Sequence, residues 1–222
     1  MRRVELNPLD LDISVLREAA DVLRDGGVVG FPTDTVYGLA GDPRSETAVL
    51  KLYRIKSRPM EFAIPIIAAD REQVTCCVRD VTPVAESLMA SFWPGPLSIV
   101  MKAALVLDRR VLGEGESVAM RVPANSIARG LAKEFGFPIM ATSANVHGEQ
   151  PGVNGKQVFE AFGAKVDLVV DGGTTKGGSP STVVDARSEV PILVRDGAVP
   201  WSRVLGSLRG IDQGRGDLYL SD

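Results

Sequence analysis

Residues 28–39 read V-V-G-F-P-T-D-T-V-Y-G-L: an apolar run passes through a proline into two threonines that flank an aspartate. The run from Val28 to Phe31 predicts a short buried strand. Thr33 and Thr35 are two residues apart, so both hydroxyls point to the same side of an extended backbone. The segment is either a β-turn whose hydroxyls bond the local backbone, or a strand end that presents them to a ligand.

Helix-like and strand-like patterns alternate on both sides of this segment. Apolar residues recur at spacings of three and four from Asp12 to Arg24, which predicts a helix that ends at Gly26 and Gly27. Further helices are predicted at 45–53, 82–92, 126–135, 155–162 and 200–208, and strands at 63–69, 97–102, 117–122, 139–142, 168–171, 182–186 and 192–195. This alternation indicates an α/β fold around one largely buried sheet.

Composition narrows the possible classes of protein. Apolar residues make up 45% of the 222 residues, and the net charge of -3 gives no overall attraction to nucleic acid. The two cysteines, Cys76 and Cys77, are adjacent, which suits neither an ordinary disulfide nor a zinc site. The N-terminus lacks an apolar signal core, and no run approaches the ~20 apolar residues of a membrane span. We therefore expect a cytoplasmic protein without a membrane partner. The single histidine, His147, excludes sites that need two histidine ligands, and we expect it on the surface.

Four more segments place cations or hydroxyls beside glycine, proline or apolar runs: K-S-R-P at 56–59, M-R-V-P at 120–123, T-S-A-N at 142–145 and S-T-V-V-D at 181–185. Lys56 and Arg58 lie either on a solvated helix end or in a cleft that holds an anion. Arginine binds phosphate or carboxylate through two N–H groups, and lysine binds them as a point charge. Together the segments suggest a buried pocket for an anionic, hydroxyl-rich ligand.

The remaining polar residues follow strand positions. Ser117 and Arg121 are four residues apart and share one strand face, where Arg121 is either at an edge or paired. Ser143 and Asn145 follow a predicted strand, and open α/β sheets bind ligands at the carboxyl ends of their strands. A turn or helix cap is the alternative interpretation of these two residues.

Taken in order, the five segments resemble the YrdC/TsaC family of threonylcarbamoyl-AMP synthases, over about residues 14 to 199. The resemblance implies an α/β fold with a single domain over residues 1–208, in which a twisted open mixed sheet flanked by helices surrounds a deep cavity. A longer form of the family carries a second C-terminal domain. This chain is too short to contain that domain, so we expect the single-domain form. Residues 209–222 are expected to be a flexible tail.

The resemblance further implies a reaction. L-threonine, bicarbonate or CO2, and ATP would give threonylcarbamoyl-AMP and pyrophosphate, and the product would pass to a tRNA threonylcarbamoyl transferase complex. Mg2+ would arrive with ATP, without a protein-ligated metal site. The chain offers cations and hydroxyls, which suit electrostatic stabilisation of a phosphoryl transition state.

Site roles carry over from the family residue by residue. The resemblance assigns catalysis to Lys56 and Arg58, L-threonine binding to Thr35, Arg121, Ala141 and Ser181, and nucleotide binding to Arg58, Phe62, Ser117, Ser143, Asn145, Pro151 and Arg195. The resemblance implies Asn or Lys as the common residue at position 62, and a histidine at position 67 in some members, whereas this sequence has Phe62 and Ile67. This departure keeps open a paralogue that binds double-stranded or structured RNA, or that catalyses another carbamoyl or nucleotidyl transfer. A purely structural subunit is the third alternative.

Overall fold

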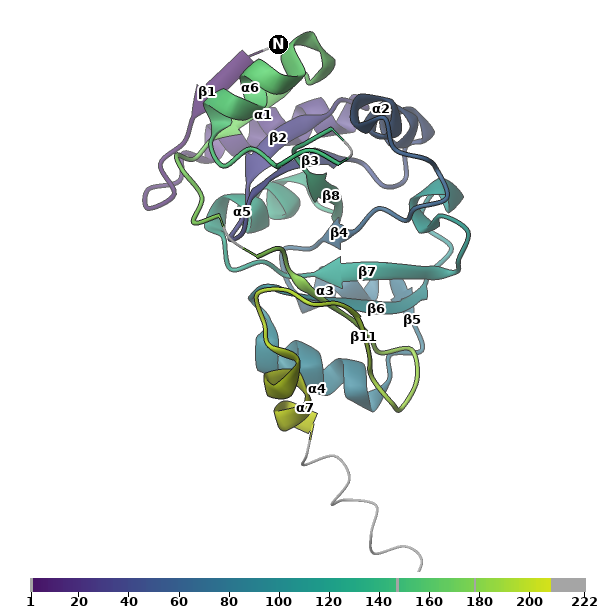
Figure 1. Ribbon diagram of the computed structural model, residues 1–222. Helices are drawn as coiled ribbons and strands as arrows, with labels where there is room; N and C mark the ends of the chain where they lie inside the picture. Colours follow the sequence, from purple (N-terminus) through teal and green to yellow (C-terminus); the bar gives the residue numbers. More distant parts are fainter. Residues whose placement is uncertain (1, 147, 178, 209–222) are drawn as a thin grey trace, which may run out of the picture.

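A twisted mixed sheet runs through the molecule, and helices flank it (Figure 1). The computed structural model describes residues 2–146, 148–177 and 179–208; the predicted tail at 209–222 and His147 lie outside these residues. Within them, neighbouring strands follow the order β1 (Arg2–Glu5), β9 (Leu168–Asp171), β2 (Val29–Pro32), β3 (Tyr37–Gly41), β8 (Ile139–Ser143), β4 (Ile66–Ile67), β7 (Ser117–Arg121), β6 (Leu97–Ala103), β10 (Thr182–Asp185) and β11 (Ile192–Arg195). The two-residue strand β5 (Val78–Arg79) pairs with the other side of β6.

The helices cover the sheet at both ends of the molecule. Helices α1 (Ile13–Arg24) and α5 (Ser126–Phe135) pack together against one side of β2, and α6 (Gly155–Phe162) packs against its other side. Helices α4 (Pro83–Phe92) and α7 (Trp201–Leu208) pack together at the opposite end (Figure 1). The remaining helices are α2 (Glu46–Lys56), α3 (Arg71–Thr75) and the short 3-10 turns η1 (Arg109–Leu112) and η2 (Gly163–Lys165).

Local sequence explains where the helices begin and end. Asp12 accepts a hydrogen bond from the Ser14 N–H at 2.9 Å and starts α1. Thr82 starts α4 in the same way, with Pro83 at the first helical position. Gly136, with φ of +80°, ends α5 in a left-handed conformation. The periodic patterns therefore predict these boundaries within one or two residues.

Two predicted boundaries were wrong in places that matter for the site. Helix α2 continues to Lys56 instead of ending at Tyr53, so Lys56 lies in its last turn. The predicted strand at 63–69 is reduced to β4, Ile66–Ile67, because only these two residues pair with β7 and β8. Strands β1, β3 and β5 and helix α3 were not predicted.

The helices leave one face of the central strands open. On β7 the less buried residues are Ser117 and Ala119, and on β8 they are Ala141 and Ser143; the residues between them are buried. The alternation means that one face of these strands packs into the core and the other faces outward. The prediction that Ser117 and Arg121 share a strand face agrees with this register. The predicted mixed, open, helix-flanked sheet is confirmed.

Candidate functional site

A pocket of about 380 Å³ lies over this open face. All five segments from the sequence contribute to it, through Thr35, Arg58, Arg121, Ser143 and Ser181 among others. The full lining is Thr33, Thr35, Val36, Tyr37, Gly38, Arg58, Pro65, Ile66, Ile67, Ser98, Arg121, Ala141, Thr142, Ser143, Gln150, Pro151, Pro180, Ser181 and Arg195. The pocket thus crosses a sheet face, whereas the sequence suggested a crevice at strand ends.

Three arginines make the pocket strongly cationic. Arg121 ends β7, where its Nε donates to the Gly95 carbonyl at 3.0 Å and its Nη2 donates to the carboxylate of Asp34. Burial, together with the charge of Arg195, lowers the pKa of Arg121 to about 10, so the guanidinium stays charged at neutral pH. Asp34 is therefore the counter-charge of Arg121, a pairing that the sequence did not indicate.

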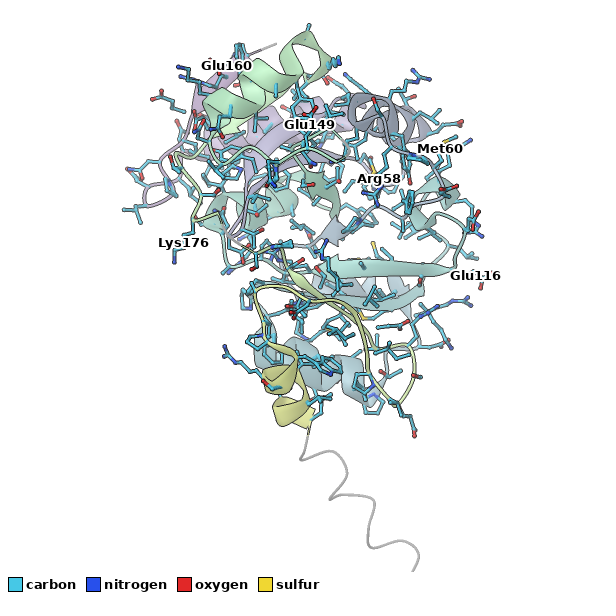
Figure 2. The ribbon with its side chains drawn as sticks, viewed as in Figure 1. Arg58, Met60, Glu116, Glu149, Glu160 and Lys176 are labelled. Atoms are coloured by element: carbon cyan, nitrogen blue, oxygen red, sulfur yellow. The ribbon has the colours of Figure 1, made fainter. Side chains whose placement is uncertain are left out.

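Arg58 has a donor without a partner in the described part of the chain. Its Nη2 donates to the Ala63 carbonyl at 2.9 Å, and its guanidinium lies 5.6 Å from the centre of the Phe62 ring. Its Nε is buried and has no hydrogen-bond partner among the described residues. Figure 2 shows Arg58 on the segment that follows α2. An unsatisfied buried donor in a cationic pocket suits an anionic ligand.

The hydroxyls of the pocket form two small networks. Arg195 donates to the Ser181 carbonyl at 2.7 Å and to its hydroxyl at 3.0 Å, and the Ser181 hydroxyl lies 2.9 Å from that of Ser98. On the other wall, the Thr33 hydroxyl donates to the Val36 carbonyl at 2.7 Å and lies 3.0 Å from that of Thr35. Thr33 thus bonds the local backbone, as the β-turn interpretation predicts, and both Thr33 and Thr35 line the pocket.

Lys56 holds protein oxygens. Its ammonium donates to the carbonyls of Ser143 at 2.5 Å and Asn145 at 2.9 Å, and to the Asn145 side-chain oxygen at 3.1 Å. The residue is 3% exposed and does not line the pocket. Burial and the nearby charge of Arg58 lower the pKa of Lys56 to about 8. Lys56 therefore fixes the turn that presents Ser143 to the pocket.

The other predicted site residues divide between the pocket and its surroundings. Ala141, Pro151 and Arg195 line it, whereas Phe62, Ser117 and Asn145 do not. Sequence reasoning missed Ser98 and Gln150, and it noted Thr33 and the aspartate at position 34 without assigning either a role in the site. Ser98 had a usable signal, because it is a single small hydroxyl inside the apolar stretch that became β6.

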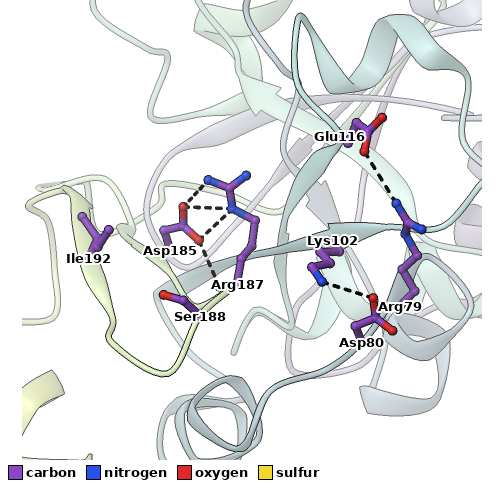
Figure 3. Close-up of a pocket in the computed structure, with 8 residues that line it drawn as sticks. All are labelled: Arg79, Asp80, Lys102, Glu116, Asp185, Arg187, Ser188 and Ile192. Carbon is purple, nitrogen blue, oxygen red and sulfur yellow. Dashed lines mark hydrogen bonds and ion pairs between the residues drawn. The ribbon is translucent and has the colours of Figure 1, made fainter.

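A second, more open groove of about 520 Å³ lies at the other end of the same sheet face, next to β5 and the β10–β11 connection (Figure 3). Its charges pair with one another: Arg79 with Glu116 at 3.6 Å, Lys102 with Asp80 at 3.3 Å, and Arg187 with Asp185 at 2.6 Å. Because its charges are already neutralised, the arginine-lined pocket is the better candidate site.

In the described part of the chain, no group of three or more His, Cys, Asp or Glu side chains is placed to hold a metal ion. Within the same residues, every helix is too short or too polar to cross a membrane.

Comparisons with known proteins point to one family. Residues 21–197 match the sequence model of the Sua5/YciO/YrdC family, described as Telomere recombination. The chain is 37% identical over 197 residues to a threonylcarbamoyl-AMP synthase of Pyrococcus abyssi. The aligned residues make up 87% of this chain and 58% of that protein. The chain is 34% identical over 206 residues to the Bacillus subtilis protein of the same name, which covers 91% and 59%. The crystal structure of P. abyssi Sua5 complexed with L-threonine superposes with a TM-score of 0.89 at 34% identity, over 93% of this chain and 60% of the other. The chain thus spans about three fifths of the length of the curated relatives it matches.

Proposed function

Because the chain belongs to the Sua5/YciO/YrdC family, we propose that it is a threonylcarbamoyl-AMP synthase. The substrates would be L-threonine, bicarbonate or CO2, and ATP. The observation that carries the proposal is the pocket itself: it brings Arg58, Arg121 and Arg195 together with the hydroxyls of Thr35 and Ser181. Three cations and convergent hydroxyls suit a ligand set that contains carboxylates, a phosphate chain and a threonine side chain.

The amino acid would bind at the end of the pocket formed by Thr35, Arg121, Ala141 and Ser181. Arg121 would attract the carboxylate, while Asp34 holds its guanidinium in place. The hydroxyls of Thr35 and Ser181 would bond the threonine hydroxyl, and Ala141 would supply an apolar wall. A relative of known structure is complexed with L-threonine, which supports L-threonine as the amino acid substrate.

The nucleotide would bind beside it. The free Nε of Arg58 and the guanidinium of Arg195 would contact phosphate oxygens, with the Ser143 hydroxyl and Pro151 on the opposite wall. Ser117 lies further along the same open face as Arg121, so a ligand that extends along the sheet would reach it. Phe62, Asn145 and Lys56 lie outside the pocket lining and would act on its shape.

The chemistry would then be positioning and charge stabilisation. The threonine amine adds to CO2, forming a C–N bond and releasing a proton to solvent. An oxygen of the resulting carbamate attacks the α-phosphorus of ATP, and the bond to pyrophosphate breaks. Cations placed around the transferred group stabilise the charge that moves onto pyrophosphate. Mg2+ would enter as part of the nucleotide substrate. The product would be consumed by a tRNA threonylcarbamoyl transferase in the cytoplasm.

One observation favours a second candidate. Ile67 lines the pocket next to Arg121 on the neighbouring strand. The family resemblance places a histidine at this position in some members. A paralogue with another carbamoyl or nucleotidyl transfer, or with RNA as its ligand, would be consistent with such a change. The net charge of -3 argues against the RNA alternative.

Binding of threonine and valine tests the proposal. Valine is nearly isosteric with threonine but lacks the hydroxyl, and a site that bonds a hydroxyl rejects the analogue without it. By isothermal titration we expect L-threonine to bind at least about tenfold more tightly than L-valine, and Ser181→Ala to reduce the difference. Incubation with ATP, bicarbonate and threonine should release pyrophosphate and form an acyl-adenylate. Equal affinities without pyrophosphate release would contradict the synthase; release with another amino acid would favour the paralogue.

A further inference from the structure

The segment that carries Arg58 lies on the surface and has little core packing of its own. It begins at Ser57, which caps α2 in a left-handed conformation with φ of +49°. Met60 and Phe62 are 53% and 45% exposed, respectively. Arg58 nevertheless reaches into the pocket, and its Nη2 is bonded to the backbone of the same segment, at Ala63. The position of the guanidinium therefore depends on what holds residues 57–63.

A buried tyrosine provides the first hold. Tyr53 lies in α2 and is 4% exposed. Its hydroxyl lies 2.8 Å from the Phe62 carbonyl and 2.9 Å from the Arg110 carbonyl, so one hydroxyl proton serves both acceptors. Burial raises the pKa of Tyr53, which keeps this proton in place at neutral pH. The hydroxyl thus joins three parts of the chain: α2, the Arg58 segment and η1.

A glycine provides the second hold. Gly113 has φ of +62°, and a Cβ at this position would overlap the Glu61 carbonyl oxygen and lie 2.8 Å from the Ala63 nitrogen. The Ile64 N–H also donates to the Val111 carbonyl at 2.8 Å. The turn after η1 therefore forms a backstop against the outer side of the segment, and the backstop requires a residue without a side chain.

We propose that Tyr53 and Gly113 are positioning residues that set the guanidinium of Arg58 for an anionic ligand. The inference rests on the proposed function, in which that ligand is the ATP phosphate chain. Neither residue lines the pocket. Both residues contact the backbone between Glu61 and Ala63. Arg58 donates a hydrogen bond to the Ala63 carbonyl, so a shift of this backbone also shifts its guanidinium.

We call the contacts of Tyr53 and Gly113 with residues 61–63 the clamp. Two variants and two matched controls test it. Tyr53→Phe removes the hydroxyl alone. Gly113→Ala adds a methyl group that would overlap the Glu61 carbonyl oxygen, so the segment has to move away from the turn. Gly136→Ala is the control for the glycine, because Gly136 has φ of +80° but a Cβ there would meet nothing within 4 Å. Thr82→Val is the control for loss of a bonded hydroxyl at a distance from the pocket. We expect ATP affinity to fall about fivefold in Tyr53→Phe and more in Gly113→Ala, with both controls within about twofold of the wild type. Each is measured well below its own melting temperature.

A double-mutant cycle separates positioning from general destabilisation. In an Arg58→Ala background, Tyr53→Phe should have almost no further effect on ATP affinity, because its route to the ligand is already lost. Independent effects in the double variant would overturn the proposal. Hydrogen exchange of the unliganded protein gives a readout that does not depend on ATP: amides at 58–64 should exchange faster in Tyr53→Phe and stay unchanged in Thr82→Val. Unchanged exchange at 58–64 refutes the clamp, whereas faster exchange in a protein that does not bind ATP refutes the synthase alone.

Discussion

Replacing Lys56 with methionine distinguishes a structural ammonium from a ligand-binding one. In the structure, its three N–H groups serve three oxygens of Ser143 and Asn145 at 2.5, 2.9 and 3.1 Å. Hydrogen bonds from a charged donor are each worth roughly 1.5–3 kcal/mol. Methionine has a similar length and no donor, so all three bonds are lost while the packing is largely kept.

The cost of burying the charge offsets part of this loss. Burial disfavours the charged ammonium, which lowers the pKa of Lys56 from its ordinary 10.5 to about 8. Leaving the Ser143 and Asn145 oxygens without a donor costs roughly 1–3 kcal/mol each, so we expect a net destabilisation of at least about 2 kcal/mol. For a chain of this size each kcal/mol lowers the melting temperature by roughly 2–4 °C. We therefore expect calorimetry to show a decrease of at least about 5 °C.

The dependence on pH adds a second test. Below pH 8 Lys56 is charged in both the folded and the unfolded state. Between about pH 8 and 10.5 the folded state loses the proton first, so the unfolded state binds more protons and the wild type gains stability relative to Lys56→Met. The gain should be about 1 kcal/mol between pH 7 and pH 9 in urea titrations. A melting temperature within 2 °C of wild type, with no pH-dependent difference, would refute this reasoning and return Lys56 to the role of a free phosphate ligand.

Two further substitutions test neighbouring contacts. Asp34→Asn removes the counter-charge of Arg121, so the free energy of unfolding should fall by about 2 kcal/mol, and sulfate should raise the melting temperature more in the variant than in the wild type; an equal response to sulfate would show that the pair does not form. Phe62→Asn should change the free energy of unfolding by less than about 1 kcal/mol, because the ring is 45% exposed. ATP affinity should change by less than about fivefold, because the clamp still holds the backbone of the segment. A large loss of stability would show that the ring is part of the core.

Much of the fold was predictable because its signals are local. Helices α5 and α6 and strands β9 and β11 have the predicted bounds, since their apolar periods and flanking caps agree. Strand β3 was missed because its sequence, Y-G-L-A-G, contains two glycines and lacks alternation. It is a strand because β2 and β8 pair with it on both sides, which is tertiary information.

The composition of the site was more predictable than its geometry. The five segments do converge, but the partners of their charges could not be read from spacing. Lys56 and Arg58 look alike in sequence, yet one extra turn of α2 directs Lys56 to the Ser143 turn and leaves Arg58 at the pocket. Asp34 pairs with a residue 87 positions away, a contact that only the register of the folded sheet establishes.

The order of the strands has a consequence for synthesis of the chain. Residues 2–5 pair with residues 168–171, and the pocket needs Arg195, which follows them. Strand pairs so distant in sequence close late, because the entropy of a long loop must be offset first. On the ribosome, a nascent chain that has not yet exposed residue 195 therefore lacks part of the pocket wall. Chains truncated before residue 195 would therefore bind the ligand weakly or not at all. Full-length chains would bind it and gain stability by mass action.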